Sequence, residues 1–168
     1  MLELKFYPDP IFKQRAKLVE VFDQSILTLE KDFFEALEFY KALGIGANML
    51  GILSRVIIVS CGNSTPIFMV NPVITPISEQ KEFGEESSLS ISGITLQIPR
   101  YQNINVQYQT SSGTKKIIEA QGLLARVIQH ETDYLNGLTI FDHISETKKL
   151  LSLEKYKKLQ KAKNRNMS

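Results

Sequence analysis

His130 and Glu131 are the adjacent residues in this chain whose types are best suited to catalysis. The sequence His130-Glu131-Thr132-Asp133-Tyr134 has the pattern of the zinc-binding helix motif H-E-x-x-H, with Tyr134 in place of the second histidine. In that motif two histidines four residues apart bind a metal ion, and the glutamate removes a proton from the metal-bound water. The alternative is a satisfied core pair of His130 and Tyr134, which is the commoner role of a lone histidine on an apolar helix face. These residues alone leave both interpretations open.

A helix over residues 123–137 is expected to position this pair. Residues three and four apart share one face of a helix. One face carries Leu123, Val127, His130 and Tyr134, its neighbour carries Leu124, Ile128, Glu131 and Leu135, and the polar face carries Arg126, Gln129, Asp133 and Asn136. Asn136-Gly137 predicts the C-terminal end of the helix. His130 and Glu131 are therefore expected to point into the interior, where polar groups without partners are costly.

The segments before this helix predict one further helix and a series of strands. Apolar residues at helical spacing predict a helix from residue 23 or 24 to residue 43. Strands are predicted at residues 55–60, 67–70, 73–77, 94–98, 104–108 and 114–119, with a break at Asn71-Pro72 and a polar stretch over 80–92. This order predicts an α+β fold, with antiparallel sheets around the central helix that carries His130-Glu131.

Composition and charge fit one globular domain. The chain has 168 residues, 43% of them hydrophobic, and a formal net charge of +2. This near balance excludes a protein that binds polyanions over its whole surface, although the tail is rich in lysine. We expect a domain at residues 1–145 and a basic C-terminal helix or tail, solvated at its end, at residues 146–168. No apolar run is long enough to cross a membrane.

The remaining reactive residues predict no second catalytic centre. Cys61 is the only cysteine, so we expect neither an internal disulfide nor a disulfide-linked partner. With no charged and then apolar leader at residues 1–12, this cysteine content indicates the reducing cytoplasm. Cys61 and His143 are predicted to be structural. The glycine loop at residues 44–46 lacks the lysine and the further glycine of a phosphate-binding loop.

Three segments of the chain carry a wider pattern. Residues 44–51 read G-I-G-A-N-M-L-G, residues 86–90 read E-S-S-L-S, and residues 129–135 read Q-H-E-T-D-Y-L. In this order they resemble the motifs G-x-G-x-A-A-x-Q, E-G-C-L-S and Q-H-E-x-D-H-L of the bacterial peptide deformylases, which remove the formyl group from the N-terminal methionine of new proteins. Further matches lie at residues 7–10, 71–72, 98–100, 124–126 and 136–142. We therefore expect common descent and a deformylase-like fold.

The resemblance assigns a role to several positions. Deformylases bind iron(II) or zinc through one cysteine and two histidines, and the corresponding residues here are Ser88, His130 and Tyr134. Glu131 corresponds to the general base and the backbone N–H of Leu89 to an oxyanion donor, whereas Gly51 replaces the glutamine that supplies the second donor. The positions that border the peptide in the family correspond to Ile45, Gly46, Glu86, Leu89 and Arg100.

The replacements predict a lost metal centre. A serine hydroxyl and a neutral phenol are poor substitutes for a thiolate and an imidazole. We predict that no cofactor is bound, that deformylase activity is absent, and that a groove for N-terminal methionine peptides or nascent chains is retained. Ser88 and Tyr134 are expected within hydrogen-bond reach of His130, and burial favours a Glu131 that is protonated or hydrogen-bonded to the Tyr134 hydroxyl.

Three alternatives remain open. One is an atypical hydrolase of N-formylmethionyl peptides that still uses iron(II) or zinc, with a ligand that the sequence does not reveal. Another is nucleophilic catalysis by a Ser88-His130-Glu131 triad, although adjacent helical residues point about 100° apart, which is poor geometry for such a triad. The third is an interaction protein whose basic tail, residues 148–165, contacts ribosomal RNA through phosphates.

Overall fold

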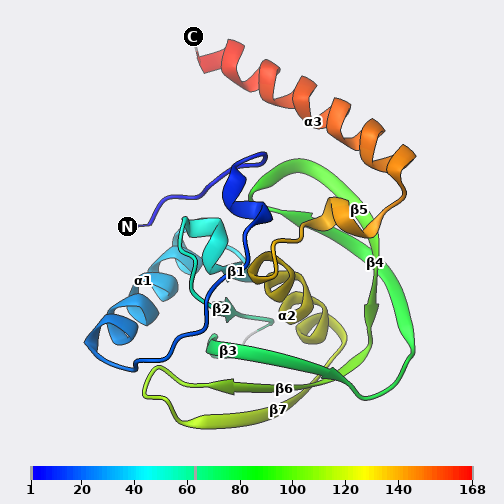
Figure 1. Ribbon diagram of the computed structural model, residues 1–168. Helices are drawn as coiled ribbons and strands as arrows, with labels where there is room; N and C mark the ends of the chain where they lie inside the picture. Colours follow the sequence, from blue (N-terminus) through cyan, green and yellow to red (C-terminus); the bar gives the residue numbers. More distant parts are fainter. Residues whose placement is uncertain (1, 63, 168) are drawn as a thin grey trace.

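The computed structural model describes residues 2–62 and 64–167. Met1 and Ser168, which end the two predicted regions, and Asn63, which lies in a predicted turn, are outside the described residues. Helix α2 (Gly122–Leu135) packs against strands of both sheets, and the predicted α+β fold with a central helix is confirmed (Figure 1). Its residues Ala125, Ile128 and Leu135 are fully buried.

Two antiparallel sheets surround α2. The five-stranded sheet has the order β1-β2-β3-β6-β7, and the second sheet is the β4–β5 ribbon. The strands are β1 (Gly44–Gly46), β2 (Val56–Val59), β3 (Ile67–Pro76), β4 (Lys81–Ser88), β5 (Ile91–Tyr101), β6 (Asn103–Gln109) and β7 (Lys115–Gln121). Every residue of β2 is buried, as expected for an apolar central strand.

Helix α1 (Gln24–Tyr40) starts where the sequence predicts and ends three residues early. The Asp23 carboxylate accepts a hydrogen bond from the Ser25 N–H at 2.9 Å and caps the first turn. The predicted end at residue 43 is wrong because Lys41 adopts a left-handed conformation that terminates the helix. The chain must then become extended, since Gly44 to Gly46 pair with β2.

Two strand predictions are also wrong in detail. The polar stretch at residues 80–92 contains β4, which pairs with β5 and has little apolar surface to reveal it. The predicted break at Asn71-Pro72 is a bulge within one continuous strand, β3, where the register with β6 shifts. Asn71 stabilises its positive φ of 52° by bonding the backbone N–H and the carbonyl of Val19.

The predicted faces of α2 need two corrections. Gln129 was assigned to the polar face but is 7% exposed, because β5 covers that side and its amide bonds both the N–H and the carbonyl of Tyr101. Leu123 was assigned to the interior but is 52% exposed, since it lies in the first turn of α2. The predicted end of the helix is confirmed, with Asn136 as the C-cap and a positive φ at Gly137.

The last helix, α3 (Glu146–Met167), packs against β5 and leads to the C-terminal end of the chain (Figure 1). Its Tyr156 is buried and donates a hydrogen bond to the Tyr7 carbonyl at 2.9 Å, and Lys163 Nζ, nearer its end, donates to Ser92 Oγ at 2.9 Å. Three short 3-10 helices complete the chain: η1 (Pro10–Lys13), η2 (Ala47–Leu50) and η3 (Ile140–His143). None of the described helices is both long and apolar enough to cross a membrane. Contact of the tail with ribosomal RNA stays a prediction.

Candidate functional site

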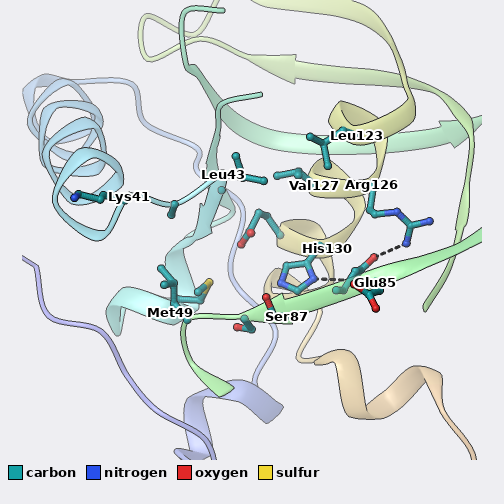
Figure 2. A pocket seen from close by; sticks show the side chains of 15 residues that line it. Lys41, Leu43, Met49, Glu85, Ser87, Leu123, Arg126, Val127 and His130 are labelled. Atoms are coloured by element: carbon teal, nitrogen blue, oxygen red, sulfur yellow. Dashed lines mark hydrogen bonds and ion pairs between the residues drawn. The ribbon is translucent and has the colours of Figure 1, made fainter. Parts of the chain in front are cut away.

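A cavity of about 300 Å³ lies beside α2, and we call it the His130 cavity. Figure 2 shows that its side chains come from α2, from β4, from η2 and from the segment that joins α1 to β1. Its polar wall includes Glu85, Glu86, Ser87, Ser88, Arg126, His130 and Glu131, and its apolar wall includes Leu43, Met49, Leu89, Leu123 and Val127. The cavity therefore combines an apolar side with a set of titratable groups, most of them from α2 and β4.

Glu86 is the centre of a buried ionic cluster. Its carboxylate accepts hydrogen bonds from Arg100 at 2.8 and 2.9 Å and from Arg126 at 3.0 Å, and it lies 2.7 Å from His130 Nδ1. Burial raises the pKa of Glu86, but the bonds to Arg100 and His130 outweigh it and lower the pKa to about 2. The bond to Glu86 likewise raises the pKa of His130 against the effect of burial. Glu86 is thus a carboxylate whose oxygens are already used by protein cations.

Glu131 lies next to this cluster without a comparable partner. It is 4% exposed, and the Gly46 N–H bonds its carboxyl group, while Oε2 has no hydrogen-bond partner among the described residues. Burial raises the pKa of Glu131 to about 7. The expected bond to the Tyr134 hydroxyl is not formed. Glu131 is therefore a carboxyl group poised between its neutral and charged forms at the cavity wall.

The Tyr134 hydroxyl bonds Ser88 instead. Ser88 Oγ and the Tyr134 hydroxyl oxygen are 2.5 Å apart, and both side chains are buried. Burial raises the pKa of Tyr134, so the phenol is neutral. The expected reach of both hydroxyls to His130 is not the arrangement found, because His130 Nδ1 faces Glu86. The two hydroxyls form a pair of their own.

This pair bears on the metal that the resemblance implies. Two of the three family ligand positions hold neutral hydroxyls that bond each other. The third, His130, contacts Glu86 through Nδ1, an arrangement that is also usual for a metal-binding histidine, so the mismatch lies at Ser88 and Tyr134. Among the described residues no group of three or more histidine, cysteine, aspartate or glutamate side chains is arranged to hold a metal ion. The donor set does not fit iron(II) or zinc, which bind imidazole and thiolate in such open sites.

Of the two positions assigned to the oxyanion, one lines the His130 cavity and the other does not. Leu89 is in the turn between β4 and β5 and lines the His130 cavity. Gly51 is the C-cap of η2, has φ of 77° and lies outside the cavity wall. A side chain there would meet the backbone strain of the left-handed region and the Lys5 side chain, 2.9 Å from the ideal Cβ position. A glutamine at residue 51 is thus disfavoured by the local backbone.

Of the five positions assigned to the peptide, Leu89 lines the cavity, and the other four are brought together there only in part. Glu86 lines the cavity. Ile45 is buried within β1 and does not line it, and Gly46 also lies outside the lining, although it contacts Glu131, which does line the cavity. Arg100 is 5% exposed and does not line this cavity, because its guanidinium bridges Glu86 and Asp133. Arg100 therefore supports Glu86 from the side away from the cavity.

Sequence reasoning missed Arg126 and Lys41. Arg126 was placed on the outer polar face of α2, yet it lines the His130 cavity and bonds Glu86 (Figure 2). The signal was available, because Arg126 and His130 are four residues apart and share a face. Lys41 lies at the edge of the cavity because the left-handed C-cap of α1 ends the helix there, which residue spacing does not reveal.

No Ser88-His130-Glu131 triad is formed, because the side-chain bonds of Ser88 and His130 go to Tyr134 and Glu86.

The two other reactive residues, Cys61 and His143, lie outside the cavity. Cys61 is half-buried, and burial raises the pKa of its thiol, as for an unreactive cysteine. His143 Nε2 lies 2.7 Å from Asp133 Oδ2, on a different side of α2.

Comparison with known proteins identifies the family. The family model of polypeptide deformylase matches residues 1–150. A peptide deformylase-like protein of Rickettsia conorii is 40% identical over 156 residues, which cover 91% of this chain and 85% of the relative. A peptide deformylase of Agrobacterium fabrum is 34% identical over 160 residues, which cover 93% and 94%. The crystal structure of peptide deformylase from Ehrlichia chaffeensis superposes with a TM-score of 0.91 at 33% identity, over 97% of this chain and 98% of that one, so the predicted deformylase-like fold is confirmed. The chain therefore belongs to the peptide deformylase family.

Proposed function

We propose that this protein binds the N-terminal segment of methionine-initiated peptides and does not deformylate them through a bound metal. The observation that carries the proposal is the 2.5 Å bond between Ser88 and Tyr134, at the positions of two family metal ligands. Metal-bound water loses its proton near pH 7, whereas bulk water does so at about 15.7. Without that activation, Glu131 faces unactivated water and a stable formamide.

The strand arrangement supports peptide binding. Within the described strands, β1 pairs only with β2 and β4 pairs only with β5, and both β1 and β4 contribute to the His130 cavity. Each strand has one edge that no described strand pairs with, and an extended peptide can bind such an edge as an additional strand. The apolar wall of Leu43, Met49, Leu123 and Val127 offers a surface for an unbranched side chain such as methionine.

Two measurements test the proposal. The first is elemental analysis of metal per chain, on protein purified anaerobically without a metal-affinity column, combined with an assay of formate release from formyl-Met-Ala-Ser. The second is calorimetric titration with formyl-Met-Ala-Ser and with Met-Ala-Ser. We expect no stoichiometric iron or zinc, no formate, and saturable binding of at least one peptide. About one equivalent of iron or zinc with formate release, or binding of neither peptide, would overturn the proposal.

A matched pair of variants locates the binding. Leu43 is 50% exposed at the cavity and Leu27 is 44% exposed on α1, away from it. We expect Leu43→Asp to weaken peptide binding about tenfold or more and Leu27→Asp to leave it unchanged, because only Leu43 would lose apolar contact with the peptide. Equal effects of the two substitutions would place the peptide elsewhere.

A further inference from the structure

We propose that a second hollow, on the other side of α2, binds a small carboxylate that is attached to an apolar body. This hollow, which we call the Asp133 hollow, has a volume of about 440 Å³. Gln129, Thr132 and Asp133 of α2 and its C-cap Asn136 line it, whereas Leu123, Arg126, Val127, His130 and Glu131 of α2 line the His130 cavity. Since the two sets share no residue, this inference does not depend on the proposed function.

The hollow has more cationic than acidic side chains. Arg55, Lys81 and Arg100 line it together with His143, and Asp133 is the only acidic residue among the described residues of its lining. Arg100 donates to Asp133 Oδ2 at 2.5 Å, and His143 Nε2 lies 2.7 Å from the same oxygen. The one carboxylate is thus already shared by two partners. The charges of the other two cations are left without a balancing anion in the hollow.

Arg55 and Lys81 are those two cations. Within the described part of the chain neither has a carboxylate at ion-pair distance. Arg55 donates only to neutral acceptors, the Leu135 carbonyl at 3.3 Å and Asn136 Oδ1 at 3.0 Å. Burial and the charge of Arg15 lower the pKa of Arg55, as expected for a half-buried guanidinium without a counter-charge. An arginine side chain can bind a carboxylate through two parallel N–H bonds, so an anion would satisfy it.

The walls of the hollow are apolar and stiff. They are formed by Pro72, Val73, Ile74, Pro76, Pro99 and Tyr101. Lys81 Nζ lies 4.5 Å from the centre of the Tyr101 ring, within the range of a cation–π contact. Three prolines restrict the backbone, so little conformational freedom is lost when a ligand binds. These walls favour an organic anion over a bare ion, because only the former gains from apolar contact.

Benzoate and its neutral analogue benzamide are suitable probes. We expect benzoate to bind saturably in a titration followed by amide chemical shifts, with the largest shifts at Tyr101, Thr132 and Asp133, and benzamide to bind at least tenfold more weakly. Equal binding of the two compounds, or no saturable binding of benzoate, would overturn the proposal. If inorganic phosphate saturates the same amides as tightly as benzoate, the hollow holds an adventitious ion only and the proposal also fails.

Variants test the two cations separately. We expect Lys81→Met to weaken benzoate binding about threefold and Arg55→Lys about tenfold, because lysine lacks the second parallel N–H donor. Lys116→Met is the matched control, since Lys116 is an exposed lysine of β7 outside the hollow, and its binding should equal that of the unmodified protein. Arg55 also holds the end of α2, so Lys81→Met keeps the test valid if Arg55→Lys fails to fold. Wild-type affinity in Lys81→Met would contradict the assignment.

Discussion

Ser88 of β4 and Tyr134 of α2 hold each other through a 2.5 Å hydrogen bond between their hydroxyl groups. A metal ion at the corresponding family positions would join the same two elements. In this chain a bond between two neutral side chains joins them. It links the β4–β5 ribbon to the central helix without an ion, and several predictions about stability and binding depend on it.

Removing one hydroxyl should destabilise the fold. Tyr134→Phe leaves Ser88 Oγ without its phenol partner, and we expect a loss of about 1–2 kcal/mol in the free energy of unfolding. Urea unfolding followed by circular dichroism measures this loss. The double variant Ser88→Ala/Tyr134→Phe should recover part of it, because no unpaired hydroxyl remains. A double variant less stable than the sum of the single variants would show that the bond is not the relevant interaction.

Restoring one ligand should not restore the metal. In Ser88→Cys, Tyr134 still occupies the second position, and we expect no stoichiometric zinc by elemental analysis. The double variant Ser88→Cys/Tyr134→His presents a thiolate and two imidazoles, and it should bind about one equivalent. Stoichiometric zinc in the single variant would mean that the tyrosine does not prevent coordination.

Acid should destabilise the protein through Glu86. Its folded pKa is about 2, below the ordinary value of 4.5, so its charged form stabilises the fold above pH 4.5. This contribution, on the order of 3 kcal/mol, is lost as the pH falls from 4.5 toward 2. Urea unfolding between pH 2 and pH 6 should show a steeper loss in the unmodified protein than in Glu86→Gln. If the free energy of unfolding falls with pH equally in the unmodified protein and in Glu86→Gln, Glu86 is not the cause of the acid destabilisation.

Glu131 should have the opposite effect on stability. Its folded pKa is raised from 4.5 to about 7, so folding favours its protonated form. Its contribution is fully present below pH 4.5 and is lost as the pH rises through 7. Glu131→Gln, which resembles the neutral form, should therefore gain stability relative to the unmodified protein between pH 5 and pH 8. If the free energies of unfolding of Glu131→Gln and the unmodified protein differ by the same amount at pH 5 and at pH 8, the pKa of Glu131 in the folded protein is ordinary.

Glutamine should not be tolerated well at residue 51. Gly51 has φ of 77°, and a side chain in this region costs about 1–2 kcal/mol. We expect Gly51→Gln to lower the free energy of unfolding by that amount. Gly51→Asn is the control, since asparagine adopts this conformation more readily and should cost less. Unchanged stability in Gly51→Gln would show that the loop rearranges without strain.

The sequence predicted the elements that have a repeating apolar pattern. Helix α2 was recognisable because Val127, Ile128 and Leu135 recur on adjoining faces and Asn136-Gly137 ends the helix. Strand β4 was not, because its buried residues near the cavity are the polar Glu86 and Ser88. A hydrophobic pattern cannot report a strand whose inward side chains form ion pairs and hydrogen bonds.

The sequence predicted which residues form the site, but it did not predict which of them bond to each other. The motifs placed Ser88, His130 and Tyr134 near one another, but the choice of Glu86 as the partner of His130 depends on the fold. Glu86 and Arg100 lie on neighbouring strands, 14 residues apart, and only the pairing of β4 with β5 brings them together. The spacing of charged residues along the sequence does not show which of them form ion pairs in the folded protein.

The hydrogen bond from Tyr156 to the Tyr7 carbonyl joins residues 149 positions apart. During synthesis the segment around Tyr7 is made first and must wait for almost the whole chain before this partner exists. Contacts of such long range form late, since the intervening chain must be brought together first. The Tyr7 N–H also donates to the Ser90 carbonyl, and the Tyr7 ring packs against Phe141, and both partners are made before α3. We therefore expect the N-terminal segment to dock in stages, with the Tyr156 bond as its last contact.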